Sequence, residues 1–339
     1  MRKYLEYFNG NFPSDIADKT SIDNWPYVGY SNEGVVFTVI PTPVEGPTNN
    51  EIWYTSSDGN VVTPYDTSVF EANIVSNIYE GDKGVITFDK EITSIGSGAF
   101  KYRSTLISVI IPASVTTIEE SAFFGCYYLK TVTIPNSVTD IKSKAFYDCQ
   151  QLDSVIIPCS VTTIEGSAFG GSNAVKYLTL DSNAIVSSAR SSLSSYLTNR
   201  FRFSEAAECI IGDNVTSIGD YFFYGSSYLA SIIIPNSVTR IGDGAFINCG
   251  SLTSIFIPDS VTSIGGGTFA NNSRLTSVRL PNSITIIGYE MFSMCESLTS
   301  IPISNNVTRI EGWAFRGCKS LTEVTIPNSI SKIESYTFY

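Results

Sequence analysis

Histidine is absent from the 339 residues of this sequence. Because imidazole is the base of Ser-His-Asp and Cys-His catalysis and a common zinc ligand, those classes of site are excluded. The 7 cysteines include no C-x-x-C pair, so neither a redox motif nor a disulfide framework is indicated. No apolar run approaches the roughly 18 residues of a transmembrane helix. Residues 1–20 also lack the apolar segment of a secretory signal peptide.

Positive charge is scarce as well. The chain has 21 Lys and Arg residues against 32 Asp and Glu, a net charge of -11. Nucleic acids and anionic membrane surfaces both require basic patches, so neither is expected as a partner. Charged residues make up only 16% of the chain and hydrophobic residues 43%, a balance typical of a folded protein with a large core.

What the sequence does contain is a repeat of 23 residues. The repeat is aligned on the proline of phrases such as "IFIPDS", and eleven units share it. One interval is 31 residues long, so it carries an insertion of 8. The aligned positions are Asp89, Pro112, Pro135, Pro158, Asp181, Gly212, Pro235, Pro258, Pro281, Ser304 and Pro327.

Each unit repeats one set of apolar positions. In one unit they are Leu129, Val132, Ile134, Val138, Ile141, Ala145, Phe146 and Cys149. Such a short unit cannot bury these side chains alone, but stacked units convert each position into a continuous buried column. Alternating β-branched residues indicate strands, the proline ends the first strand, and Asn or Asp followed by Ser predicts a turn.

The fold class is therefore a repeat solenoid. We expect a right-handed, leucine-rich-repeat-like coil with a parallel β-sheet on its concave wall. The phrases "LKTVTIPNSVTDIKSKAFYDC" and "LTEVTIPNSISKIESYTF" resemble the BspA-like leucine-rich repeats of bacterial surface proteins. That resemblance implies adhesion and binding to host or extracellular-matrix proteins, and it carries no catalytic residues.

Two regions depart from the repeat. Between Asp181 and Gly212 the "IGxxAF" corner is missing, and residues 187–201 are consistent with a helix or with a Ser-rich loop that bulges from the outer wall. At the other end, residues 1–46 are predicted to form a small module and residues 47–84 a β-hairpin cap, with a turn at Asp58–Gly59. The solenoid is assigned to residues 85–339.

The polar and sulfur-bearing side chains are predicted to be structural. The Cys column includes Cys126 and Cys249, and because Ser or Asn replaces Cys in other units, we expect buried, reduced thiols. Glu119, Lys142 and Glu165 share one column and predict a charge ladder on a solvated face. No carboxylate pair stands out for acid–base chemistry, so no enzyme, metal site or cofactor is expected.

The concave wall is the candidate binding site. Two and four residues before the aligned proline, side chains should point outward, and successive units place apolar and aromatic residues there. Aromatic residues and Arg are enriched at interaction hot spots. The residues predicted to bind a partner are Ile210, Ile233, Phe256, Arg279, Tyr177 and Glu208.

These observations favour a non-catalytic recognition or adhesion protein at a cell surface, with a protein or glycan ligand. The alternative is a structural or assembly component, such as part of a phage particle, because a short N-terminal stretch also resembles phage structural proteins. The last unit leaves Ile326 and Ile333 uncovered, so self-association through residues 320–339 is a further expectation.

Overall fold

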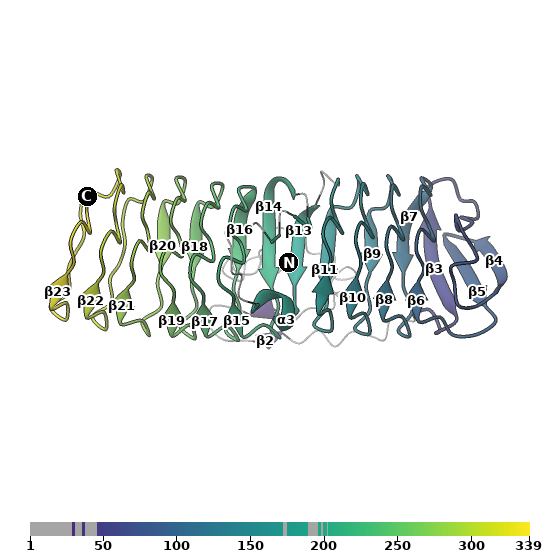
Figure 1. The fold of residues 1–339 in the computed structure, drawn as a ribbon, viewed down its shortest axis with the longest axis horizontal. Helices are drawn as coiled ribbons and strands as arrows, with labels where there is room; N and C mark the ends of the chain where they lie inside the picture. The colour runs from purple at the N-terminus through teal and green to yellow at the C-terminus, as the bar shows by residue number, and fades with distance from the viewer. Residues whose placement is uncertain are drawn as a thin grey trace. The chain divides into compact units, whose positions relative to one another are not determined.

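A computed structural model describes residues 29–30, 36–37, 46–171, 175–188, 196–197, 199–201 and 203–339. The chain divides into two units, residues 1–46 and 47–339. In the first unit, the two-residue strands β1 (Gly29–Tyr30) and β2 (Val36–Phe37) pair antiparallel. The second unit is a row of stacked coils (Figure 1), which is the predicted solenoid.

Each regular coil has a longer strand, a turn, a two-residue strand and a tight corner. The longer strands are β7 (Leu106–Ile110), β9 (Thr131–Thr133), β11 (Ser154–Ile157), β13 (Val175–Leu180), β14 (Phe203–Ile211), β16 (Leu229–Ile233), β18 (Ser254–Phe256) and β20 (Ser277–Arg279). The short strands are β6 (Ser94–Ile95), β8 (Thr117–Ile118), β10 (Asp140–Ile141), β12 (Thr163–Ile164), β15 (Ser217–Ile218), β17 (Arg240–Ile241), β19 (Ser263–Ile264), β21 (Ile286–Ile287), β22 (Arg309–Ile310) and β23 (Lys332–Ile333).

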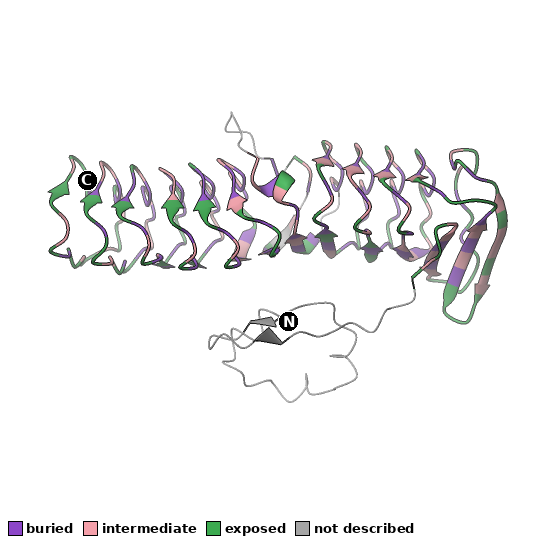
Figure 2. Cartoon of the chain, turned by 90° about the horizontal axis from the view of Figure 1, so that it is seen from below, coloured by how far each residue is buried: buried purple, intermediate pink, exposed green. Residues whose placement is uncertain are grey.

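Pairing between these strands keeps the sequence columns in register. Thr117, Asp140 and Thr163, which share one column, lie side by side in parallel strands. The longer strands do the same, as Ser108 against Thr131 shows. Around each coil, buried and exposed residues alternate (Figure 2), as expected for strands with one face on a core.

The recurrent phrase "PNSVT" is explained by contacts between neighbouring coils. In one coil the hydroxyl of Ser137 donates to the carbonyl of Val115, 2.6 Å away. The backbone N–H of Thr139 donates to the carbonyl of Thr116 at 2.8 Å. Proline has no N–H to contribute, so the long strand ends there and the chain turns into the short strand. Ser and Thr recur because the hydroxyl of each donates to a carbonyl of the coil before it, as that of Thr139 does to Thr116 at 3.3 Å.

The core is a set of columns, as predicted, with phenylalanine as the largest member. Phe123 and Phe146 stack with ring centroids 5.1 Å apart and an interplanar angle of 3°. The side chains at this position are fully buried in the middle coils, for example Phe246 at 0% exposure. Offset-stacked rings add a favourable interaction to the burial of their area.

The long unit keeps a phenylalanine that the sequence analysis missed. Phe201 stacks on Phe169 with centroids 4.6 Å apart, so the residues inserted in this unit precede the Phe position instead of replacing it. The short strand is replaced by the helix α3 (Asn183–Val186), which Ser182 caps by accepting the N–H of Ile185. The predicted helix or loop of residues 187–201 falls mainly on residues 189–195 and 198, which lie outside the described residues.

The first coil is covered by a strand pairing that the hairpin prediction did not foresee. β3 (Glu51–Ser56) lies between β5 (Lys83–Phe88) and β7 and is antiparallel to both. The hairpin in this region joins β4 (Ile74–Glu80) to β5 through Gly81. The hairpin expected at Asp58–Gly59 was wrong: the turn forms, but the following residues pair with no strand because β3 already has two partners. The domain boundary at residue 84 stays a prediction.

Candidate partner-binding surface

The outward side chains of the longer strands form one continuous surface, here named the long-strand face. It consists of the residues two and four positions before the aligned proline. Tyr177 and Phe256 are 44% and 56% exposed, whereas the neighbouring inward residues Leu178 and Ile255 are 1% and 4% exposed. The predicted outward orientation is therefore confirmed, although its use as a binding site stays a prediction.

The structure brings the six predicted residues into adjacent strands. Tyr177 on β13 lies beside Glu208 on β14. Ile210 on β14 lies beside Ile233 on β16, and both are half-buried. Phe256 on β18 lies beside Arg279 on β20. The six side chains thus occupy five longer strands that follow one another in the stack, in the order β13, β14, β16, β18 and β20.

Arg279 is fixed in place rather than free in solvent. Its guanidinium carbon lies 4.6 Å from the centroid of the Phe256 ring. Its Nη2 atom lies 2.7 Å from a carboxylate oxygen of Asp259, and Nη1 donates to the carbonyl of Ile257 at 3.2 Å. The hydrogen bond from Arg279 holds the pKa of Asp259 below its usual value. An aromatic ring and a cation are thereby presented together with little side-chain freedom left to lose on binding.

A hollow of about 220 Å³ lies next to this pair, lined by Arg279, Pro302 and neighbouring residues. Pro302 stands at an outward position that other units fill with Thr, Ile, Phe or Arg. Proline cannot donate to a strand ladder. The parallel pairing after β20 accordingly reduces to an isolated bridge between Ser277 and Ser300. The irregularity gives the surface a concave feature beside its most exposed aromatic residue.

Sequence reasoning missed Trp53, which extends the long-strand face at its N-terminal end. Trp53 lies on β3 between Val85 and Ile110. The ammonium of Lys83 sits 3.7 Å from the centroid of its ring. The signal was present in the alternation of "EIWYTS", where Ile52 and Tyr54 are buried and Trp53 therefore points outward. A similar pairing occurs where the Lys176 ammonium lies 5.1 Å from the Tyr177 ring.

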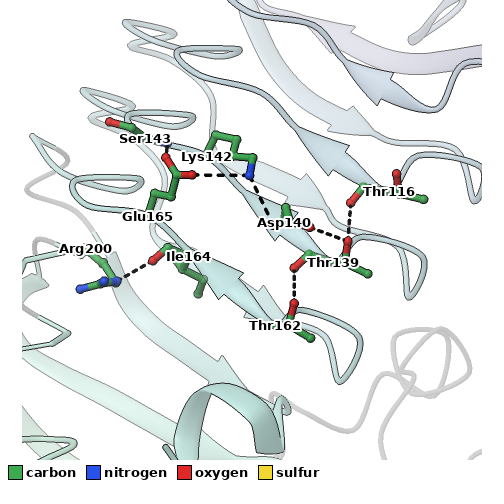
Figure 3. A network of polar contacts seen from close by, with 9 residues as sticks. All are labelled: Thr116, Thr139, Asp140, Lys142, Ser143, Thr162, Ile164, Glu165 and Arg200. Carbon is green, nitrogen blue, oxygen red and sulfur yellow. Dashed lines mark hydrogen bonds and ion pairs between the residues drawn. The ribbon is translucent and has the colours of Figure 1, made fainter. Parts of the chain in front are cut away.

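The short-strand side carries a polar network, shown in Figure 3. Lys142 forms ion pairs with Glu165 at 3.5 Å and with Asp140 at 3.4 Å, so the predicted ladder forms between Lys142 and Glu165. Glu165 also accepts the N–H of Ser143 at 3.0 Å. A hydrogen bond from Thr139 and the charge of Lys142 hold the pKa of Asp140 below its usual value. These contacts join successive coils, so the carboxylates contribute to the stacking of the solenoid.

The cysteine column is buried and unbridged. The 7 cysteines are free, and those at the column position donate to a phenylalanine carbonyl, as Cys126 does to Phe100 at 3.0 Å. Burial raises the pKa of the Cys126 thiol to about 12. Cys209 is buried in an inward strand position, whereas Cys159 is exposed. Within the described ranges no group of three or more potential metal ligands was found.

This arrangement predicts the outcome of a thiol titration. In the native protein at neutral pH we expect Cys159 to react rapidly with a disulfide reagent, because it alone among the cysteines is exposed. Denaturation without reductant should then release all 7 thiols. A Cys159→Ser variant should lose the rapid phase only. Fewer than five thiols in the denatured chain would contradict a reduced column.

The comparisons with known proteins agree with the repeat. The family profile described as "BspA type Leucine rich repeat region (6 copies)" matches residues 79–194, 197–310 and 285–339. The chain belongs to this family. The comparison with curated proteins gave no match.

Three solved structures illustrate the similarity. A leucine-rich cell surface protein of Faecalibacterium prausnitzii is 30% identical over 73% of this chain and 73% of its own, with a TM-score of 0.34. A leucine-rich repeat protein of Bacteroides ovatus is 26% identical, covering 78% of this chain and 82% of its own, with a TM-score of 0.34. One from Eubacterium ventriosum is 24% identical over 74% and 80%, with a TM-score of 0.38.

Among the residues that the structure describes, no helix has both the length and the apolar character needed to cross a bilayer. Among these residues, the helix α3 has 4 residues.

Proposed function

We propose that this repeat protein is a non-catalytic recognition protein that binds a protein partner through the long-strand face. The observation that carries the proposal is the Phe256–Arg279 pair, an exposed aromatic ring under a fixed guanidinium at the edge of a hollow. Aromatic and Arg side chains dominate the energy of protein interfaces, particularly where they are held rigidly.

The neighbouring strands support the same use. Tyr177 and Ile156 are 44% and 41% exposed on the same face, and Ile210 and Ile233 lie between them and Phe256 in the strand order. Contiguous exposed apolar area marks an interaction surface. A location at a cell surface is part of the proposal, because the Faecalibacterium prausnitzii relative is described as a cell surface protein.

The test is a binding measurement with immobilised fibronectin, laminin and collagen as probes. We expect at least one of them to bind, and the double variant Phe256→Ala with Arg279→Ala to weaken that binding at least about thirtyfold, the effect of losing one hot spot of ~2 kcal/mol. The melting temperature should change little, because both side chains are exposed and their loss leaves no internal cavity.

The control is Thr133→Ala, which truncates an exposed outward residue on β9, outside the five strands that carry the six predicted residues. It should leave binding unchanged. If the double variant still binds while its melting temperature falls, the pair serves the fold and the proposed surface is wrong. If none of the three probes binds to the intact chain, a structural or assembly role becomes the better account.

A further inference from the structure

A second surface lies at the corners that follow the last short strands. Tyr289, Trp313 and Tyr336 follow β21, β22 and β23 and line an open groove of about 490 Å³. The centroids of Tyr289 and Trp313 are 5.2 Å apart, and those of Trp313 and Tyr336 are 6.0 Å apart. We name it the aromatic groove; its other lining residues are Glu311, Gly312, Glu334 and Ser335.

The backbone at this groove holds aromatic residues where glycine is the natural choice. Trp313 and Tyr336 have φ angles of 56° and 59°. The same corner position has a positive φ in the other described coils too, at Gly98, Gly244 and Gly267 and also at Ser121, Lys144, Ser167, Tyr221 and Glu290. A bulky residue with positive φ is strained, because its Cβ crowds the backbone.

Burial does not compensate for that strain. Tyr336 is 62% exposed, and Trp313 is half-buried beside Tyr289, which is itself 45% exposed. The rings therefore add little to the core of the solenoid. The positive φ belongs to the corner of every coil, so it is the run of exposed rings over three successive corners, rather than the backbone, that points to a role in binding.

The polar side of the groove is already charge-balanced. One oxygen of Glu311 accepts the N–H of Tyr289 at 2.9 Å, and the other pairs with Arg309 at 2.5 Å. Glu334 pairs with Lys332 at 2.7 Å. Because each carboxylate has its own cation, a charged ligand would have to displace one of these pairs. An uncharged ligand can instead accept and donate hydrogen bonds to groups that are already in place.

We propose that the aromatic groove binds an uncharged pyranose unit of a glycan. Such a ring has an apolar C–H face and a rim of hydroxyl groups. The apolar face would lie against Trp313 and Tyr336, and the hydroxyls would donate to Glu311 and Glu334. The groove shares no residue with the long-strand face, so this inference stands or falls independently of the proposed protein partner.

The experiment uses tryptophan fluorescence of the full chain. The protein has 3 tryptophans, so Trp25→Phe and Trp53→Phe leave Trp313 as the sole reporter. We expect a saturable change in its emission on titration with at least one neutral oligosaccharide among cellohexaose, laminarihexaose and mannohexaose. Calorimetry with the native sequence should show binding of the same sugar.

The deciding variant is Trp313→Gly. Since glycine is native to this corner in other coils, we expect a melting temperature equal to or higher than that of the native chain, with sugar binding at least tenfold weaker. Tyr221→Gly is the matched control: Tyr221 occupies the same corner position at φ 55°, far along the stack, and its loss should leave sugar binding intact.

Three outcomes would overturn the inference. One is the absence of a saturable signal with every neutral oligosaccharide. Another is unchanged affinity in Trp313→Gly. The third is preference for a charged ligand, shown by tighter binding of tetramethylammonium or of oligogalacturonate than of any neutral sugar.

Discussion

Phe246→Ala is expected to lower the free energy of unfolding by about 3–5 kcal/mol, the range for deleting a buried aromatic side chain. The ring is fully buried between Phe223 and Phe269, with centroids 5.1 Å and 5.8 Å away. Alanine would leave a cavity in the column and remove both stacking contacts. Urea unfolding followed by circular dichroism at neutral pH would measure the loss.

The same change in an exposed member of the column is the control. Phe338 stacks on Phe315 at 5.4 Å but is 51% exposed. Because much of its surface is already in water, Phe338→Ala should cost much less than Phe246→Ala. Equal losses in the two variants would show that the column does not stabilise the fold through burial.

The position of Phe246 also affects how the chain unfolds. In a stack of repeats, each coil is stabilised chiefly by its two neighbours. A defect in a middle coil therefore weakens the coupling between the coils on either side. We expect the Phe246→Ala variant to unfold in a broader transition than the native chain, with a smaller dependence of the free energy on urea concentration.

Alkaline pH should destabilise the fold through its buried thiols. Burial raises the pKa of Cys126 and Cys249 to about 12, from an ordinary value near 9, and also raises the pKa of Cys149, Cys209 and Cys295. The neutral thiol is thus favoured by folding, and only the unfolded chain ionises readily. The stabilisation is complete below pH 9 and is lost as the pH rises from 9 towards 12.

The expected effect is large because several thiols contribute. One pH unit above the unfolded pKa, each buried thiol should lower the stability by about 1.4 kcal/mol. The measurement is the free energy of unfolding in urea at pH 8, 9 and 10, with a reductant present. The steepest decline should occur above pH 9, where the unfolded thiols ionise.

Replacing thiols isolates their share of the pH dependence. Cys126→Ser with Cys249→Ser removes two ionisable groups from a column in which other coils carry Ser226 and Asn272. The double variant should show a shallower decline of stability between pH 9 and pH 10 than the native chain. An identical decline would assign the alkaline loss to other groups, such as the tyrosines.

The repeat and its buried columns could be predicted because the units share the same spacing of apolar residues. A single "VTIP" is ambiguous between strand and loop, but eleven aligned units fix which positions face inward. Val132 and Ile134 were assigned to the core this way and are 8% exposed. The family was identified on the same residues and is confirmed by the match over residues 79–339.

The errors arose where a contact depends on distant residues. Phe201 was missed because the insertion shifted it out of the 23-residue spacing, although it stacks on Phe169. The hairpin at Asp58–Gly59 was wrong because a local turn signal cannot show that β3 pairs with β5 and β7.

The side-chain contacts within the two candidate surfaces could not be predicted from the sequence either. The sequence placed Arg279 on the outward face, but not its ion pair with Asp259, which is 20 residues earlier. The aromatic groove depends on the distance between three successive corners and on the backbone φ angle at each corner. The identity of a residue such as Trp313 predicts neither quantity. Spacing therefore predicts which face a residue occupies, while the partners of its side chain require the coordinates.

The hydrogen bonds from Ser137 to Val115 and from Thr139 to Thr116 recur at the same sequence separation in other coils, as Ser260 to Val238 and Thr262 to Thr239 illustrate. The junction between two regular coils is therefore chemically the same at many places along the stack. Recombination between the matching DNA segments could add or remove a whole repeat in frame and still produce a seamless junction. The number of repeats between them would then set the distance from the Phe256–Arg279 pair to the aromatic groove, so that related genes differ in reach while both sites keep the same residues.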